Sequence, residues 1–350
     1  MVAFSYGEWD YICRNSPQPI CNLFFRQLLI NPERGQSFAP DRSLRLPTSS
    51  DQLNEALSDS GIGINPRCTI PRMGSVGGQD GSLGNIANII TCCISFLVSI
   101  YLLIRASRRR AAVGRVEVMI FFMVYGLISI FQLLDTGSIL KQGTRSIVWL
   151  TSIHHSLIVD LFGLLVWIGF LQFQLLEDGS SLSLTIVTIW NLICLVPFDY
   201  IFLDTAFGIT TYFLSKPASH LYSPWTFSMV FLFPIISVFL YSIFTITVSI
   251  KTLREFKPIL ILLLSLTSLL IGTVLFRYIL TVRICESSRA KVDGSFLGSL
   301  FETFSLMLFY LLWINLTEED WEDDDEDELE EEDFRREDQQ LYRNQSDNFK

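Results

Sequence analysis

The sequence predicts an all-α integral membrane protein with seven transmembrane helices, and three observations support that fold class. Half of its 350 residues are hydrophobic and 28 are phenylalanine, which is more apolar surface than a soluble domain buries. Seven apolar runs are each long enough to cross a membrane. The net charge of −10 comes from the end of the chain, where residues 317–350 contain 17 Asp and Glu against 4 Lys and Arg. The rest of the chain is mildly basic, so the acidic balance does not indicate an acidic soluble protein.

Each of the seven runs matches the length of a membrane-spanning helix. A helix rises about 1.5 Å per residue, so about 20 residues cross about 30 Å of hydrocarbon. Runs this continuous exclude the short alternating strands of a β-barrel. Pro197 and Pro234 lie inside the fourth and fifth runs and predict bends there, because proline removes a backbone donor. The runs cover residues 86–104, 116–134, 147–170, 182–203, 227–250, 258–276 and 296–316.

Basic residues after the first run predict the orientation of the chain. Short loops rich in Lys and Arg stay in the cytosol, so the N-terminus is predicted to be luminal or extracellular. Seven crossings return the C-terminus to the cytosol, and the basic loop 251–257 falls on the same side. Residues 1–20 lack the continuous apolar core of a secretory signal peptide, so the first helix is expected to carry the preceding segment across. The basic residues after the first run are Arg105, Arg108, Arg109, Arg110 and Arg115.

This topology divides the chain into three regions. Residues 1–85 form a loop-rich luminal segment, residues 86–316 form the seven-helix domain, and residues 317–350 form an acidic cytosolic tail that is expected to be disordered. Because disulfides form in the lumen, we expect two of them, at least one in the N-terminal segment. Four cysteines allow three pairings, which the sequence leaves open, and free or metal-bound thiols are the alternative. The cysteines on the luminal side are Cys13, Cys21, Cys68 and Cys285.

Polar residues inside the third run are the first candidates for a site within the membrane, because such groups are costly in lipid. Asp160 lies midway along the run, shortly after His154 and His155. These three could form a proton relay or part of a zinc site, but a zinc site requires three protein ligands and an open position. We therefore expect no metal and no cofactor. Asp160 is expected to make an interhelical hydrogen bond, the two histidines to lie near the luminal interface, and Arg277 to reach that interface.

The acidic tail contains a candidate export signal. Cargo adaptors of vesicle coats read acid-x-acid spacings in cytosolic tails, and such spacings occur at Asp324, Asp325, Glu326, Asp327 and Glu328. A run of 14 acids between residues 318 and 333 contains such spacings by chance. A solvated tail without an adaptor is therefore the simpler interpretation.

Short motifs occur at fixed places along the chain. The N-terminal motifs are Tyr11-Ile12-Cys13, Pro19-Ile20-Cys21 and Pro66-Arg67-Cys68. The later motif positions are Gly114, Arg115, Glu117, Glu177, Asp178, Gly179, Asp293, Gly294 and Trp313. Each motif is weak alone, but in this order over nearly the whole chain they resemble the fungal chitin synthase export chaperone family. The long interval between Cys21 and Cys68, followed by Thr69-Ile70-Pro71, indicates a divergent member.

The resemblance implies a non-catalytic chaperone of the endoplasmic reticulum membrane. Its client would be a chitin synthase, a polytopic membrane protein that the chaperone helps to fold and to leave for the plasma membrane. The chaperone could accompany its client there. Its other expected partners are membrane lipid and, through the tail, a cargo adaptor of a vesicle coat. No nucleic acid is expected among its partners.

A seven-helix receptor, or another polytopic membrane protein with a ligand-sensing role, is the alternative. The residues argue against a receptor, because the third run ends in Leu176-Glu177-Asp178-Gly179 and not in an acid-Arg-aromatic triplet. A transporter would be expected to show internal repeats and charged, broken helices. An enzyme would need a catalytic constellation, and the sequence indicates none.

Overall fold

The computed structural model describes residues 5–30, 68, 70, 84–109, 112–136, 140, 144–174, 181–210, 212–214 and 221–317. Within these ranges it is all-helical, and seven helices are long and apolar enough to cross a membrane. The predicted fold class is therefore confirmed. The first four spans are α5 (Ile86–Arg108), α6 (Arg115–Thr136), α7 (Arg145–Leu171) and α8 (Ser181–Phe207).

The fifth and sixth spans include wider, π-helical turns. The fifth span consists of α9 (Pro224–Phe227), η1 (Ser228–Leu232), α10 (Phe233–Val248) and η2 (Ser249–Leu253). The sixth consists of α11 (Lys257–Leu270) and η3 (Ile271–Ile279), and the seventh is α13 (Gly294–Leu316). Pro234 directly follows the first residue of α10, after the π-helical turn η1. Pro197 lies inside α8.

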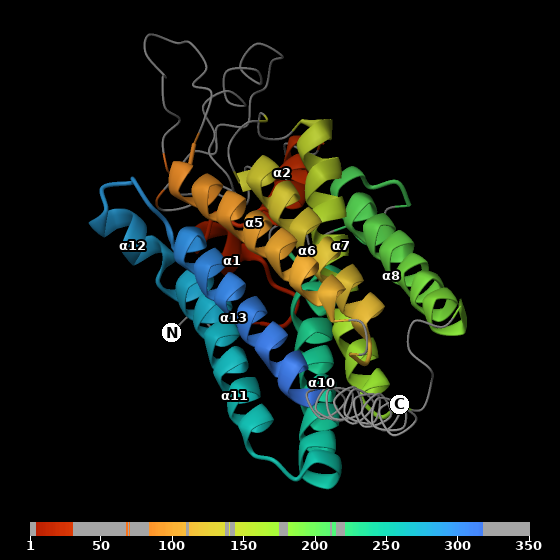
Figure 1. Cartoon of the computed structure of the whole chain (residues 1–350). Helices are drawn as coiled ribbons and strands as arrows, with labels where there is room; N and C mark the ends of the chain where they lie inside the picture. The colour runs from red at the N-terminus through yellow and green to blue at the C-terminus, as the bar shows by residue number, and fades with distance from the viewer. Residues whose placement is uncertain are drawn as a thin grey trace, which may run out of the picture.

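The spans run side by side, and three shorter helices lie toward one end of the bundle (Figure 1). These are α1 (Asp10–Asn15), α2 (Cys21–Ile30) and α12 (Thr281–Ser287). In the bundle α7 packs against α6, α8 and α10, while α13 packs against α5, α11 and η3. We call the end near α2 the plug end and the end at Leu316 the tail end.

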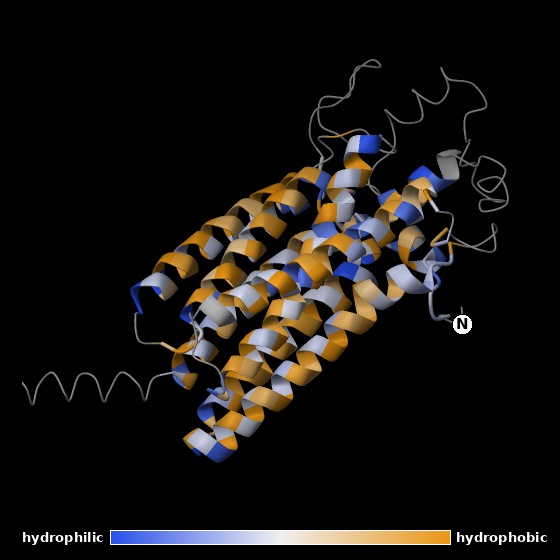
Figure 2. Cartoon of the chain, turned by 90° about the vertical axis from the view of Figure 1, so that its right-hand side faces the viewer, coloured by the Kyte–Doolittle hydropathy of each residue, from blue (hydrophilic) through white to orange (hydrophobic). Residues whose placement is uncertain are grey.

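The interior of the bundle is more polar than its surface. On α5 the buried residues include Asn88, Thr91 and Ser95, whereas Ile94 and Leu97 are exposed. Figure 2 shows hydrophobic ribbon along the lengths of the helices and hydrophilic ribbon mainly near their ends. Helices in lipid gain little by hiding apolar side chains from lipid, so small and polar residues form their contacts. This pattern is the one expected of a membrane bundle.

Candidate functional site

The N-terminal segment begins as a folded plug. Residues 5–30, which we call the N-terminal plug, contain α1 and α2 joined by the Cys13–Cys21 disulfide. The side chains of Trp9 and Phe24 are fully buried against residues of α7, α8 and α9. The sequence predicted a loop-rich segment and did not predict these two helices, which are too short and too mixed in polarity to read as spans.

Hydrogen bonds connect the plug to three parts of the bundle. Asn22 Nδ2 donates to Thr151 Oγ1 of α7 at 3.1 Å, and Trp9 Nε1 donates to the Ser223 carbonyl before α9 at 3.3 Å. Ser16 Oγ donates to the backbone carbonyl of Arg277 at 2.7 Å. This last bond joins the plug to η3, the π-helical part of the sixth span.

The same Arg277 carries a charge into the bundle. Its Nη2 donates to Glu302 Oε2 at 2.5 Å and to Ser299 Oγ at 3.1 Å, both on α13. Both charged side chains are largely buried, at 12% and 19% exposure. The sequence predicted that Arg277 would reach the membrane interface. That prediction is wrong, because the side chain points into the bundle toward Glu302, whose countercharge offsets part of the cost of removing the guanidinium from water.

Ser299 is the junction of a polar cluster around this ion pair. Gln132 Nε2 of α6 donates to Ser299 Oγ at 2.8 Å, and Ser299 Oγ lies 3.2 Å from Asn88 Oδ1 of α5. Asn88 Nδ2 in turn donates to Thr136 Oγ1 at 2.7 Å. We call Asn88, Gln132, Arg277, Ser299 and Glu302 the polar core. The polar core connects four spans, which are α5, α6, the sixth span and α13. Through the backbone carbonyl of Arg277 it also contacts the plug.

The histidines of the third span lie inside the protein. His154 Nδ1 is 2.6 Å from Asp135 Oδ2, and both side chains are buried. His155 is also buried, with Nδ1 2.9 Å from the Thr151 carbonyl oxygen. Both histidines are thus held by contacts within the protein, and their expected depth near the luminal interface stays a prediction. Asp135 escaped notice in the sequence because it was assigned to a loop, whereas α6 extends through it to Thr136.

Asp160 faces the fourth span. Once the side-chain amide of Asn191 is oriented so that its nitrogen donates, that nitrogen lies 3.2 Å from Asp160 Oδ1. This contact is interhelical, from α8 to α7, as expected for Asp160. Among the described residues no group of three or more His, Cys, Asp and Glu side chains is arranged to hold a metal ion.

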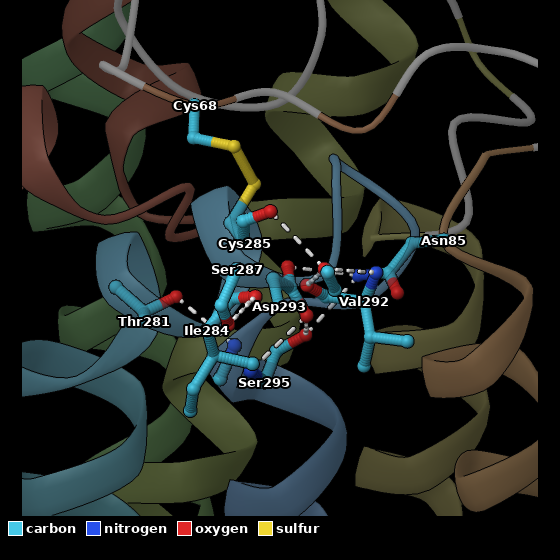
Figure 3. Close-up of a disulfide and its surroundings, with 11 residues drawn as sticks. Cys68, Asn85, Thr281, Ile284, Cys285, Ser287, Val292, Asp293 and Ser295 are labelled. Carbon is cyan, nitrogen blue, oxygen red and sulfur yellow. Dashed lines mark hydrogen bonds between the residues drawn. A yellow bond between two sulfur atoms is a disulfide. The ribbon is translucent and has the colours of Figure 1, made fainter.

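A second disulfide ties the N-terminal segment to the loop before α13. Cys68 pairs with Cys285 of α12, 217 positions further along the chain, as Figure 3 shows. Nearby, Asn85 Nδ2 donates to Asp293 Oδ2 at 3.0 Å, and Asp293 caps α13 by accepting from the Ser295 amide. At Gly294 an added Cβ would overlap the backbone carbonyl of Phe276. The motif pair Asp293 and Gly294 therefore starts α13 and permits its close approach to the sixth span.

The motif residues near the second span meet those of the seventh at the tail end. Gly114 has a φ of +69°, in the left-handed region that favours glycine. Trp313 Nε1 donates to the Val113 carbonyl at 2.9 Å. Glu117 is buried and accepts from Ser183 Oγ of α8 at 2.5 Å, while Arg115, at the start of α6, is half-buried. These motif positions thus fasten the helix ends together.

Two sets of predicted residues lie outside the described part of the chain. These are Glu177, Asp178 and Gly179 after the third span, and the tail acids Asp324, Asp325, Glu326, Asp327 and Glu328. Within the described part, the sequence analysis missed Glu302, Ser299 and Gln132. A polar residue every three to four positions along an otherwise apolar helix was the available signal, since Ser295, Ser299 and Glu302 recur at that spacing.

Comparison with known proteins decides the family. The profile of the chitin synthase export chaperones matches residues 5–326, from the start of the plug past the seventh span. The chain belongs to this family. Chitin synthase export chaperones are not enzymes, so the polar core is to be interpreted as structural and not as catalytic.

Individual chitin synthase export chaperones match at low identity over most of their length. The protein of Cryptococcus neoformans is 24% identical over 92% of this chain and 77% of its own length. That of Kluyveromyces lactis is 24% identical over 91% of this chain and 94% of its own. That of Eremothecium gossypii is 27% identical over 91% and 87%. No solved structure matches the chain significantly.

Proposed function

We propose that this chain is a membrane chaperone of the endoplasmic reticulum that is required for a chitin synthase to fold and to leave for the plasma membrane. The observation that carries the proposal is the family match, which includes the plug and all seven spans. The mechanism is non-catalytic binding. An incompletely folded polytopic client exposes helix faces in the lipid, and a partner helix can cover them.

The proposed orientation places the plug end in the lumen and the tail end in the cytosol. Both disulfides lie toward the plug end, as an oxidising lumen requires. The loop after the first span and the loop before the sixth are basic at the tail end, as the positive-inside rule favours. Among the described residues, the exposed bases there are Arg105, Arg108, Lys251, Arg254 and Lys257, against Arg145, Arg283, Arg289 and Lys291 at the plug end.

We place the client-binding surface on the fourth, fifth and sixth spans. In their most apolar stretches only 22%, 17% and 22% of the residues are buried, against 61% in the third span. These three spans therefore contribute most of the free helix surface. Exposed residues such as Ile193, Phe239 and Leu263 offer apolar contacts to a client helix.

The acidic tail is a second, separate proposal within this function. Asp324, Asp325, Glu326, Asp327 and Glu328 would load the chaperone and its client into export vesicles through a cargo adaptor. Replacing these five residues with Asn and Gln should slow export while leaving client binding intact. Export at the normal rate would leave the tail as a solvated segment.

Deletion of the gene tests the main proposal. Microscopy of a tagged chitin synthase should then show it in the endoplasmic reticulum, and cell-wall chitin should fall. Re-expression of the full chain should restore both readouts, whereas an unrelated seven-span protein should not. Normal traffic of every chitin synthase in the deletion strain would contradict the proposal.

A further inference from the structure

The chain leaves α8 through a turn that one carboxylate holds in place. Asp204, in the last turn of α8, is fully buried. It accepts hydrogen bonds from the Thr210 amide at 2.5 Å, from Thr210 Oγ1 at 2.8 Å and from the Phe213 amide at 3.0 Å. We call residues 208–210 and 212–214 the aromatic loop. Because Asp204 binds Thr210 in the first part of the loop and Phe213 in the second, it fixes the position of both parts relative to the end of α8.

The aromatic loop turns apolar side chains outward. Ile209 is 62% exposed and Tyr212 is 69% exposed. Phe213 is half-buried and packs edge-on between two exposed aromatic residues, with ring centroids 6.4 Å from Tyr200 and 5.9 Å from Trp225. A soluble surface rarely gathers exposed aromatic side chains in one patch without a partner.

The position of this patch along the helices indicates the partner. The Phe213 amide donates to Asp204, which lies one turn before the end of α8. The loop therefore folds back beside the end of the helix instead of extending away from it. The 27 residues of α8 span about 40 Å, whereas the hydrocarbon core is about 30 Å thick. An α8 centred on the hydrocarbon core would extend about 5 Å beyond it at each end, which would bring its last turn and the loop beside it to the level of the lipid headgroups.

Neighbouring spans carry aromatic residues at the same end. Trp225 is in the first turn of the fifth span, and Trp149 is near the start of the third, 47% and 49% exposed. The Trp149 ring contacts Phe207, the last residue of α8, at 6.4 Å between centroids. Trp and Tyr concentrate at membrane interfaces because their rings are apolar at one side and polar at the other.

We propose that the aromatic loop is a lipid-interface anchor, which lies in the boundary between headgroups and acyl chains at the plug end and holds α8 at a fixed depth. The partner is the bilayer itself. The patch is continuous with the apolar surface of α8, where Ile189, Ile193 and Val196 are exposed along the membrane-crossing part. When no client is bound, lipid covers that surface, so the same leaflet reaches the loop.

Photo-crosslinking of the full-length protein tests the proposal. Tyr212 is replaced by p-benzoyl-phenylalanine, and the purified protein is irradiated in phosphatidylcholine vesicles without any client. Mass spectrometry should find lipid adducts at position 212, located on the glycerol region or the upper acyl chain. The same probe at Ile193, in mid-helix, should give adducts lower on the acyl chain. Adducts at 193 with none at 212 would overturn the proposal.

Two variants test whether Asp204 holds the anchor in place. Asp204→Asn replaces one accepting oxygen with an NH2 donor, and Thr210→Val removes the Oγ1 hydrogen bond, so in each variant the probe at position 212 should lose lipid adducts. The probe at position 193 should keep its adducts, which shows that the bundle is still folded. If Asp204→Asn proves unstable, Thr210→Val alone decides the outcome. Unchanged adducts at 212 in a folded variant would overturn the role of the turn.

The client is the other possible occupant of the patch. If the probe at position 212 forms adducts only after a chitin synthase is added, and those adducts are to protein, the patch binds the client and the proposal is overturned.

Discussion

Arg277 shows at the scale of single residues how this bundle accommodates a charge. Its guanidinium reaches Glu302 and Ser299, and Gly298 provides the space, because a Cβ there would lie 2.6 Å from Arg277 Cγ. In the sequence Arg277 lies near the end of an apolar run, and that position is typical of basic side chains that reach the membrane interface. Its true environment depends on which faces of α13 and η3 meet, and that packing is not a property of either helix alone.

The ion pair yields the first prediction. Glu302→Met leaves a largely buried cation without a countercharge and should destabilise the protein by about 3–5 kcal/mol. The double variant Arg277→Met with Glu302→Met removes both charges and should recover most of that loss. Thermal unfolding of the purified protein in detergent measures both. Glu255→Met, at an exposed acid between α10 and α11, is the control and should change stability by less than about 0.5 kcal/mol. A double variant as unstable as Glu302→Met would show that the pair does not account for the loss.

Asp160 yields the second prediction. Asp160→Asn keeps an acceptor for the Asn191 amide, so stability and chitin synthase traffic should stay close to normal. Asp160→Leu removes the acceptor and should cost about 1–3 kcal/mol. Stability in detergent and client localisation are measured for both variants. Lost traffic in a fully stable Asp160→Asn protein would mean that the carboxyl group has a functional role and not only a structural one.

The N-terminal plug shows at the scale of elements how short helices can be integral to a membrane domain. α1 has 6 residues and α2 has 10, so neither could cross a membrane or be stable alone. Their stability must come from burial of Trp9, Phe24 and their neighbours, and from the Cys13–Cys21 disulfide. The sequence predicted cysteines on one side of the membrane but not their pairing. Pairing depends on where α12 brings Cys285, which hydropathy does not reveal.

Opening the plug disulfide yields the third prediction. Replacing both Cys13 and Cys21 with Ser should lower the free energy of unfolding by about 2–4 kcal/mol, because the unfolded plug gains conformational freedom. The loss should be local, because the seven spans have their own contacts. Amide hydrogen exchange should therefore rise in residues 9–25 and stay low in α6 and α7. Cys93→Ser, at an exposed free cysteine of α5, should change neither region. Unchanged exchange in the plug would show that its burial alone is sufficient.

At the scale of the whole molecule, the spans were the most predictable feature. Each of the seven predicted runs corresponds to one observed span, because about 20 apolar residues in sequence leave little alternative to a crossing helix. The interior was less predictable, since Ser299, Gln132 and Asn88 look like isolated polar residues until three helices are brought together. Motif residues such as Gly294 and Trp313 were recognised as positions of interest, and the structure adds the contacts that explain them.

Orientation belongs to the whole molecule, and it yields the last prediction. If the plug end is luminal, an acceptor site there should receive an N-glycan, and acceptor sites after the seventh span should not. Ala56→Thr places a threonine two positions after Asn54 and so creates an acceptor site in the N-terminal segment, while Asn344-Gln345-Ser346 exists in the tail. Expression in cells followed by endoglycosidase H and gel electrophoresis should show a mass shift at Asn54 and none at Asn344. Asn54→Gln in the same variant is the matched control and should abolish the shift. A glycan at Asn344 would reverse the orientation, exposing the basic loops to the lumen and both disulfides to the reducing cytosol. The charge distribution and the disulfides both disfavour that arrangement.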